Sequence, residues 1–235
     1  MSLRAICFDL DDTLWPIEPV ISHAEKTLHI WLLTHYPRLA QRFSPGDLRH
    51  LRQRLLKKQP QLRHDLSTLR KISLAQAAAH VGYSDSLVEP AFEIFMEVRH
   101  QVQLYDDVLP VLERLSNRYV LCALTNGNAE VQRVGLGHLF DAAFLAREVG
   151  AVKPEPAMFQ AACQYAQAEP SQVVHVGDDA VCDVAGAAAI GMRTVWINRH
   201  KKAWLGTPAP DAIITSLTEL EPLLREWEEE GVGNW

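Results

Sequence analysis

Short apolar runs alternate with longer amphipathic stretches through the second half of the chain. Each run is bounded by polar or glycine-containing turns, which predicts buried strands at 119–124, 142–146, 173–176, 194–197 and 212–214. Around these runs, helical periodicity predicts helices at 108–117, 128–136, 156–167, 180–190 and 217–229. Strands that alternate with helices in this way predict a parallel sheet with right-handed crossovers.

The N-terminal residues 3–10 form one more apolar run, which leads into the polar stretch Asp9–Thr13. An isolated buried strand would have no partners for its backbone groups, so we expect this strand to join the same sheet. Residues 16–103 contain no strand candidate and show helical periodicity, with prolines separating four or five helices. We therefore expect an α/β fold. A Rossmann-like parallel sheet core would be formed by 1–15 and 104–235, with a helical cap domain inserted at 16–103.

Composition and charge limit the class of protein. With 235 residues, of which 48% are apolar and 22% charged, the chain is predicted to be an ordinary folded protein and not a disordered or fibrous one. Its formal net charge of −6 gives no general attraction to nucleic acid or to an anionic membrane. No membrane-length apolar run or export signal is found, so we expect a cytoplasmic protein. Four cysteines without CxxC spacing are expected to be reduced, core-filling thiols: Cys7, Cys122, Cys163 and Cys182.

Polar residues follow four of the predicted strands. They are Asp9, Asp11, Thr125, Asn126, Lys153, Asp178, Asp179 and Asp183. Taken singly, the aspartate, threonine and asparagine residues suit ordinary turns or helix caps, and Lys153 suits a solvated side chain. Because the carboxyl ends of parallel strands share one edge of a sheet, however, we expect these residues to converge. Five carboxylates at one edge would repel one another unless a cation is present, and oxygen ligands favour a hard divalent ion, Mg²⁺ above all.

The order of these residues resembles the four sequence motifs of the haloacid dehalogenase superfamily, most of whose members are Mg²⁺-dependent phosphatases. The motifs are Asp9-x-Asp11-x-Thr13, Thr125-Asn126, Lys153-Pro154 and Gly177-Asp178-Asp179-x-x-x-Asp183. The resemblance covers nearly the whole chain. The helical insert is similar to the cap that some members carry between the first and second motifs.

The resemblance implies catalytic roles for the first three motifs. Asp9 would be the nucleophile that forms an aspartyl phosphate, and Asp11 the general acid and base. Thr125 and Asn126 would contact the phosphoryl group, and Lys153 would hold it as a cationic clamp.

The resemblance also implies a metal site. Asp178 would bind the metal directly, beside the carboxylate of Asp9 and the backbone carbonyl of Asp11. Asp179 and Asp183 would order metal-bound waters or Lys153. The chemistry suits hydrolysis of phosphate monoesters, which need acceleration of up to about 10²¹-fold and hence strong charge neutralisation.

Several other functions remain as alternatives. Members that displace halide resemble this chain but lack the second aspartate, so Asp11 favours phosphoryl transfer over 2-haloacid dehalogenation. A phosphomutase would keep both acids. A catalytically silent scaffold or regulator would have no reason to keep the whole set of motifs.

His175, inside the predicted strand 173–176, is interpreted as a packed core histidine.

The substrate is expected to be a small-molecule phosphate ester. The segment 63–70, together with the core motifs, resembles bacterial flavin mononucleotide phosphatases that also accept the phosphoribitylamino-uracil intermediate of riboflavin synthesis. A pyrimidine 5′-nucleotidase or a sugar phosphatase is the alternative. We expect Arg63, His64 and Arg70 to contact polar groups of the substrate, or else to be solvated side chains of the cap. Aromatic residues that could cover a flat ring, or simply form the cap core, are Trp31, Tyr36 and Phe43.

Overall fold

The structure is a computed structural model that describes residues 2–232. Contacts divide the chain into two compact units, each of which is described by itself. One unit joins the N-terminal residues through Pro16 to the residues from Gln103 onward, and the other is Ile17–Val102. We call them the sheet unit and the helical unit.

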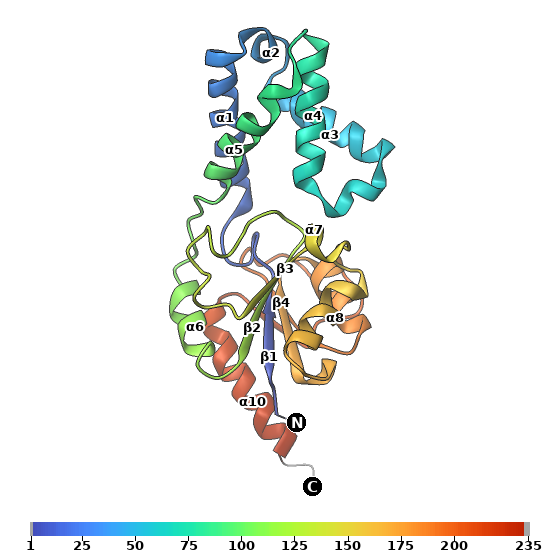
Figure 1. The fold of residues 1–235 in the computed structure, drawn as a ribbon. Coiled ribbons are helices and arrows are strands. Elements are labelled where there is room, and N and C mark those ends of the chain that lie inside the picture. The colour runs from blue at the N-terminus through green and yellow to red at the C-terminus, as the bar shows by residue number, and fades with distance from the viewer. Residues whose placement is uncertain (1, 233–235) are drawn as a thin grey trace. The chain divides into compact units, whose positions relative to one another are not determined.

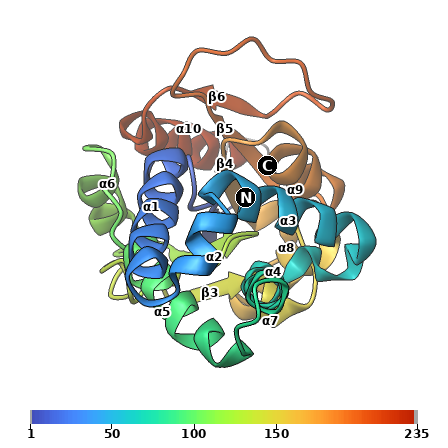
Figure 2. The same ribbon diagram turned by 90° about the horizontal axis from the view of Figure 1, so that it is seen from above.

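The sheet unit is built on six parallel strands in the order β3-β2-β1-β4-β5-β6, of which Figure 1 labels β1 to β4 and Figure 2 labels β5 and β6. Their bounds are β1 Ala5–Phe8, β2 Val120–Thr125, β3 Ala142–Leu145, β4 Val173–Gly177, β5 Arg193–Ile197 and β6 Ala212–Ile214. This confirms the predicted Rossmann-like parallel sheet. The strand order reverses at β1, and an open α/β sheet binds its ligands in the crevice at such a point, beyond the carboxyl ends of the strands.

Helices cover both faces of the sheet (Figures 1 and 2). The helices α6 (Val108–Leu115) and α10 (Leu220–Val232) lie on one face, and α8 (Pro156–Tyr165) and α9 (Gly186–Ala189) on the other. Shorter elements complete the unit: α7 Ala146–Val149, η3 Pro170–Gln172, η4 Ala180–Ala185 and η5 Leu217–Glu219. Because both faces are covered, the strands read as continuous apolar runs, and all four residues of β1 are fully buried.

The helix predicted at 128–136 is wrong, since the structure has a series of turns there. One of these turns is closed by the amide of Val134, which donates to the carbonyl oxygen of Glu130 at 3.1 Å. Gly135 then takes a φ of +86°, which ends any helix at that point. Two glycines within three residues therefore outweigh the apolar periodicity on which the prediction rested.

The helix predicted at 180–190 is divided into η4, a π-helical turn, and α9. The amides of Asp183 and Val184 both donate to the carbonyl oxygen of Asp179, at 3.0 and 3.2 Å, which widens the turn. Such single π turns are frequent at functional sites, and this one carries Asp183.

The helical unit contains five α-helices and two short 3₁₀ turns among its described residues. Their bounds are α1 Ile17–His35, α2 Pro37–Arg42, α3 Pro45–Lys58, η1 Pro60–His64, α4 Leu66–His80, η2 Asp85–Leu87 and α5 Val88–Arg99. Helices α1 and α5 lie side by side (Figure 2). Two of the helices begin at polar N-cap residues. Ser44 forms a capping box before α3, and the side chain of Asp65 accepts a hydrogen bond from the amide of Thr68 at the start of α4.

A separate apolar core holds the helical unit together. Leu28 and Leu32 of α1 meet Leu74 of α4 and Phe95 of α5 in this core, and all are nearly fully buried. Three aromatic residues singled out in the sequence pack against it: Trp31, Tyr36 and Phe43. Within the described residues 2–232, no helix combines the length and apolar character needed to cross a bilayer.

A hydrogen-bonded brace ties the loop after β1 to the rest of the sheet unit. The guanidinium of Arg199 donates twice to the carbonyl oxygen of Thr13, at 3.0 and 3.1 Å, and to both oxygens of Asp107, at 2.9 and 3.0 Å. Asp107 also accepts from the hydroxyl of Ser216 and the amide of Leu217, at 2.7 and 2.8 Å. Burial alone would raise the pKa of Asp107, but these donors hold it below its ordinary value.

We expect Asp107→Asn to lower the free energy of unfolding by about 1–3 kcal/mol at neutral pH, because the charge-assisted hydrogen bonds from Arg199 and from residues 216–217 are weakened or lost. Since folding lowers the pKa of Asp107, its contribution is present above about pH 4 and disappears as the pH falls through the folded-state value. Urea unfolding at about pH 7 and about pH 3 measures both effects. The exposed neighbour variant Asp106→Asn is the control, and equal stability of all three proteins at neutral pH would contradict the prediction.

Candidate active site

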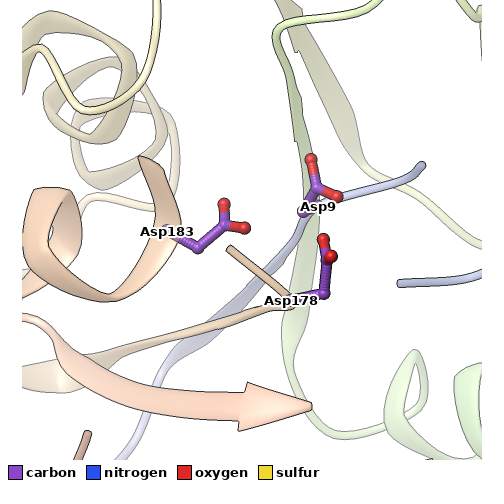
Figure 3. A group of neighbouring side chains, drawn as sticks. All are labelled: Asp9, Asp178 and Asp183. Atoms are coloured by element: carbon purple, nitrogen blue, oxygen red, sulfur yellow. The ribbon is translucent and has the colours of Figure 1, made fainter. Parts of the chain in front are cut away.

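Two neighbouring strands bring carboxylates together at one edge of the sheet. Strands β1 and β4 pair in register, Asp9 directly follows β1, and Asp178 directly follows β4. Asp183 reaches the same place from η4 (Figure 3). Each of the three offers a carboxylate oxygen, and these oxygens lie within 4.8 Å of one another.

A pocket of about 170 Å³ opens at this edge. The eight polar residues singled out after the predicted strands all line it, together with Gly127 and Cys182. The sheet thus brings together side chains from four widely separated segments of the chain. The predicted cap residues belong to the helical unit, where Arg63 is exposed and His64 half-buried in η1, and Arg70 is buried in α4.

Lys153 forms the central contact of the pocket. Its Nζ donates to Oδ1 of Asp9 and to Oδ1 of Asp183, each at 2.6 Å, and the residue is 3% exposed. The side chain of Asn126 holds its backbone at both ends, accepting from the Lys153 amide at 2.7 Å and donating to its carbonyl oxygen at 2.9 Å. Burial alone would lower the pKa of Lys153, but the two carboxylates raise it above its ordinary value, so the ammonium stays charged.

Both oxygens of Asp183 are engaged by donors. Oδ1 accepts from Lys153 and, at 2.9 Å, from Nε2 of His175, and Oδ2 accepts from the amide of Asp179 at 3.0 Å. Burial alone would raise the pKa of Asp183, but Lys153 and His175 hold it well below its ordinary value. Close packing fixes the carboxylate as well, because a Cβ added to Gly177 would lie 2.2 Å from its Cγ.

Asp9 and Asp178 carry the surplus negative charge. Burial raises the pKa of Asp9 well above its ordinary value, with Lys153 opposing and Asp183 adding to the rise. Burial, Asp183 and then Asp12 raise the pKa of Asp178 to about 7. The positive charge of Lys153 therefore does not neutralise all the carboxylates of the pocket. The remaining negative charge on oxygen ligands suits a divalent metal ion.

The turn after β1 positions Asp11. Trp15 is fully buried, and its Nε1 donates to Oδ1 of Asp11 at 2.9 Å. The amide of Asp12 donates to the carbonyl oxygen of Trp15 at 2.7 Å, and Asp12 has a φ of +63°, a conformation that aspartate adopts more readily than most residues. The tight turn therefore holds the Asp11 carboxylate at the wall of the pocket.

Two further side chains have defined orientations. Thr125 is 1% exposed, and its Oγ1 accepts from the amide of Gly127 at 2.9 Å, which leaves its hydroxyl hydrogen for another acceptor. Oδ1 of Asp179 accepts from the amides of Val181 and Cys182, at 2.8 and 2.7 Å, and so caps the π-helical turn.

The sequence interpretation of His175 missed its hydrogen bond to Asp183. The ring does lie in the core, against Phe159 with centroids 5.2 Å apart. Burial lowers its pKa, so the neutral ring donates through Nε2. The alternation of side chains along a strand could have indicated this contact. His175 and Gly177 lie on the same face of β4, and because glycine has no side chain, Asp183 has room beside the ring.

We expect His175→Leu to lower the free energy of unfolding by about 1–3 kcal/mol, because Asp183 loses a buried donor. His175→Gln supplies an N–H donor in a similar place and should recover part of the loss. Urea unfolding of the three proteins measures the difference. A leucine variant as stable as the wild-type protein would show that this hydrogen bond contributes nothing to stability.

Comparisons with known proteins show the family of the chain. A family model described as haloacid dehalogenase-like hydrolase matches residues 3–191. The 5-amino-6-(5-phospho-D-ribitylamino)uracil phosphatase YigB of Escherichia coli is 30% identical over 230 residues, which cover 94% of this chain and 96% of the relative.

Solved structures extend the similarity to the whole fold. A 2-haloacid dehalogenase from Pseudomonas syringae matches with a TM-score of 0.92 and 40% identity, over 96% of this chain and all of that one. A HAD phosphatase from Thermococcus onnurineus matches with a TM-score of 0.71 and 28% identity, over 94% and 98% of the two chains. With the match of the family model and the relative that spans nearly its full length, the chain belongs to the haloacid dehalogenase-like hydrolase family.

Proposed function

We propose that the protein is a Mg²⁺-dependent phosphatase that hydrolyses a small phosphate monoester through an aspartyl-phosphate intermediate. One observation carries the proposal: Asp9 and a second acid, Asp11, line the same pocket, and Asp9 accepts a hydrogen bond from Lys153. A nucleophilic carboxylate, a proton donor and a fixed cation are the groups that phosphoryl transfer requires.

The reaction follows from the positions of these side chains. An oxygen of Asp9 attacks phosphorus as the bond to the leaving oxygen breaks, and Asp11 gives that oxygen its proton. Asp11 then takes a proton from water, which attacks the same phosphorus and releases Asp9 with inorganic phosphate. The ammonium of Lys153 and the hydroxyl of Thr125 donate to the phosphoryl oxygens as their charge grows.

The metal site we propose consists of the carboxylates of Asp9 and Asp178 and the backbone carbonyl of Asp11. Asp183 belongs to the three carboxylates that meet in the pocket, but three donors already engage its oxygens, so we assign it to orienting Lys153. Asp179 caps η4 and supports the same region. A bound divalent ion supplies positive charge that neutralises the phosphoryl group and the surplus carboxylate charge.

Dehalogenation is the second candidate, because the Pseudomonas syringae structure that matches at 40% identity is described as a 2-haloacid dehalogenase. Halide needs no proton when it leaves, whereas an alkoxide does. The Asp11 carboxylate in the pocket therefore supports phosphoryl transfer over halide displacement.

For the substrate we propose flavin mononucleotide or a related phosphate of riboflavin synthesis. The name of the Escherichia coli relative, which covers nearly the whole chain, supports this assignment. A pyrimidine 5′-nucleotide or a sugar phosphate is the alternative, and Arg63 and His64 are the cap residues proposed to contact the leaving group.

We propose that the protein is located in the cytoplasm, where the reducing environment fits its four free cysteines.

We expect Mg²⁺-dependent phosphate release from flavin mononucleotide, and a loss of at least about a thousandfold in kcat for Asp9→Asn. A panel of nucleoside monophosphates, sugar phosphates and 2-chloropropionate, assayed with and without chelator, measures phosphate or chloride release. Asp106→Asn, exposed in the same unit, is the matched control. Preference for another ester would overturn the proposed substrate, chloride release without phosphate release would favour the dehalogenase, and no turnover would favour a silent scaffold.

We also expect the affinity for Mg²⁺ to rise as the pH increases through about 7. The pKa of Asp178 is raised to about 7, and a protonated carboxyl group is a poor ligand, so binding at lower pH must release a proton. Titration calorimetry at about pH 6 and about pH 8, in buffers of different ionisation enthalpy, measures the affinity and the proton release. Asp178→Asn should weaken binding by at least about tenfold, and Asp179→Asn by less. Equal affinity at both pH values without proton release would contradict the prediction.

A further inference from the structure

The helical unit contains a group of charged side chains in which positive charge is in excess, with Glu25 and Arg70 buried, Arg52 14% exposed and Arg49 about half exposed. Glu25 of α1 accepts from Arg49 of α3 at 2.6 Å, through Oε2, and from Arg52 of α3 through Oε1. Arg70 of α4 approaches the same carboxylate. Among the described residues, Glu25 is the one carboxylate within 4 Å of these three guanidinium groups. We call the four residues the arginine cluster.

Arg70 is the member without an adequate partner. Its side chain is 9% exposed, and Nη1 lies 3.9 Å from Oε1 of Glu25, beyond hydrogen-bond distance. Within the described part of the chain, no acceptor reaches this buried Nη1. The guanidinium lies over the ring of Phe95, 3.4 Å from its centroid, which fixes the guanidinium plane but accepts no strong hydrogen bond.

A buried guanidinium nitrogen without an acceptor needs a physical explanation. The group has five N–H donors and does not give up its proton readily. Burial lowers the pKa of Arg70 well below its ordinary value, Arg52 and Arg99 lower it further, and Glu25 only partly opposes them. The cluster therefore lacks a second negatively charged acceptor, and in folded proteins such a gap often marks a bound ion or a functional contact.

We propose that the arginine cluster, centred on Arg70, is a binding site for an oxyanion, namely a carboxylate or phosphate group. The planar fork of a guanidinium matches both groups and binds them through two parallel hydrogen bonds. Stacking on Phe95 holds the fork in one orientation, and Arg52 adds a second positive charge beside it. Glu25 already joins α1 to α3 through Arg49 and Arg52, so that link does not require Arg70.

This site goes beyond the phosphoryl pocket, because its residues all belong to the helical unit. The oxyanion has two possible sources with the same chemistry. It is either a free ion or a group on the leaving part of the substrate, and the second source rests on the proposed phosphatase function.

Titration of malonate and of inorganic phosphate into the full-length, metal-free protein tests the site without using activity. We expect Arg70→Met to weaken binding of malonate by about tenfold or more, and Arg70→Lys, which keeps the charge but not the fork, to weaken it less. Arg54→Met, an exposed arginine of the neighbouring helix α3, should bind like the wild-type protein. Equal malonate and phosphate binding by the Arg70→Met and Arg54→Met proteins would overturn the proposal.

Thermal unfolding controls for loss of fold. Arg70→Met removes a buried positive charge that Glu25 compensates only from 3.9 Å, so we expect it to unfold at no lower temperature than the wild-type protein in buffer without oxyanions. Added malonate should raise the unfolding temperature of the wild-type protein more than that of the variant. If the methionine variant fails to fold, Arg70→Lys carries the test, and unchanged malonate binding by that variant would overturn the proposal.

Kinetics with two esters distinguishes the sources. Phosphoserine carries a carboxylate on its leaving group, and p-nitrophenyl phosphate does not. If the oxyanion belongs to the substrate, Arg70→Met should lower kcat/KM for phosphoserine by about tenfold, mainly through KM, and spare the other ester. A loss of malonate binding without this selectivity identifies a free ion. Because the malonate titration needs no turnover, failure of the site and failure of the phosphatase assignment are separate results.

Discussion

The ammonium of Lys153 holds two buried carboxylates together, and the rest of the pocket at the sheet edge depends on this contact. Without that charge, three carboxylates whose oxygens lie within 4.8 Å would stay ionised only at a high cost in free energy. The surrounding residues secure the lysine and one of its partners. Asn126 fixes the lysine backbone, His175 and the Asp179 amide hold Asp183, and Gly177 provides the space that Asp183 occupies.

The sequence was sufficient to predict the sheet and the convergence of the pocket residues. Buried parallel strands leave a strong apolar signal, and a polar residue directly after such a strand can lie only at one edge of the sheet. Local backbone geometry was harder to predict. The stretch 128–136 has the apolar spacing of a helix, but Gly135 takes a left-handed conformation that periodicity does not register.

Contacts between distant residues left no local signal at all. Arg199 binds Asp107, which lies 92 positions earlier, and each residue taken alone reads as a solvated charge. The π-helical turn at 180–185 has the same apolar pattern as an α-helix, yet it decides where Asp183 points. The unequal balance of charge around Arg70 likewise appears only when α1, α3 and α4 are packed, because its members lie far apart in the chain.

The brace through Arg199 has a consequence for how the molecule moves. Thr13, two residues from Asp11, shares one guanidinium with Asp107, and Asp107 also accepts from the amide of Leu217, the first residue of the η5 turn that leads into α10. The loop that carries Asp9 and Asp11 is thus linked through Arg199 and Asp107 to the η5 turn before the C-terminal helix, so opening either segment breaks hydrogen bonds of this brace. Hydrogen exchange at the amides of this loop therefore reports on the integrity of a helix more than 200 residues away in the chain.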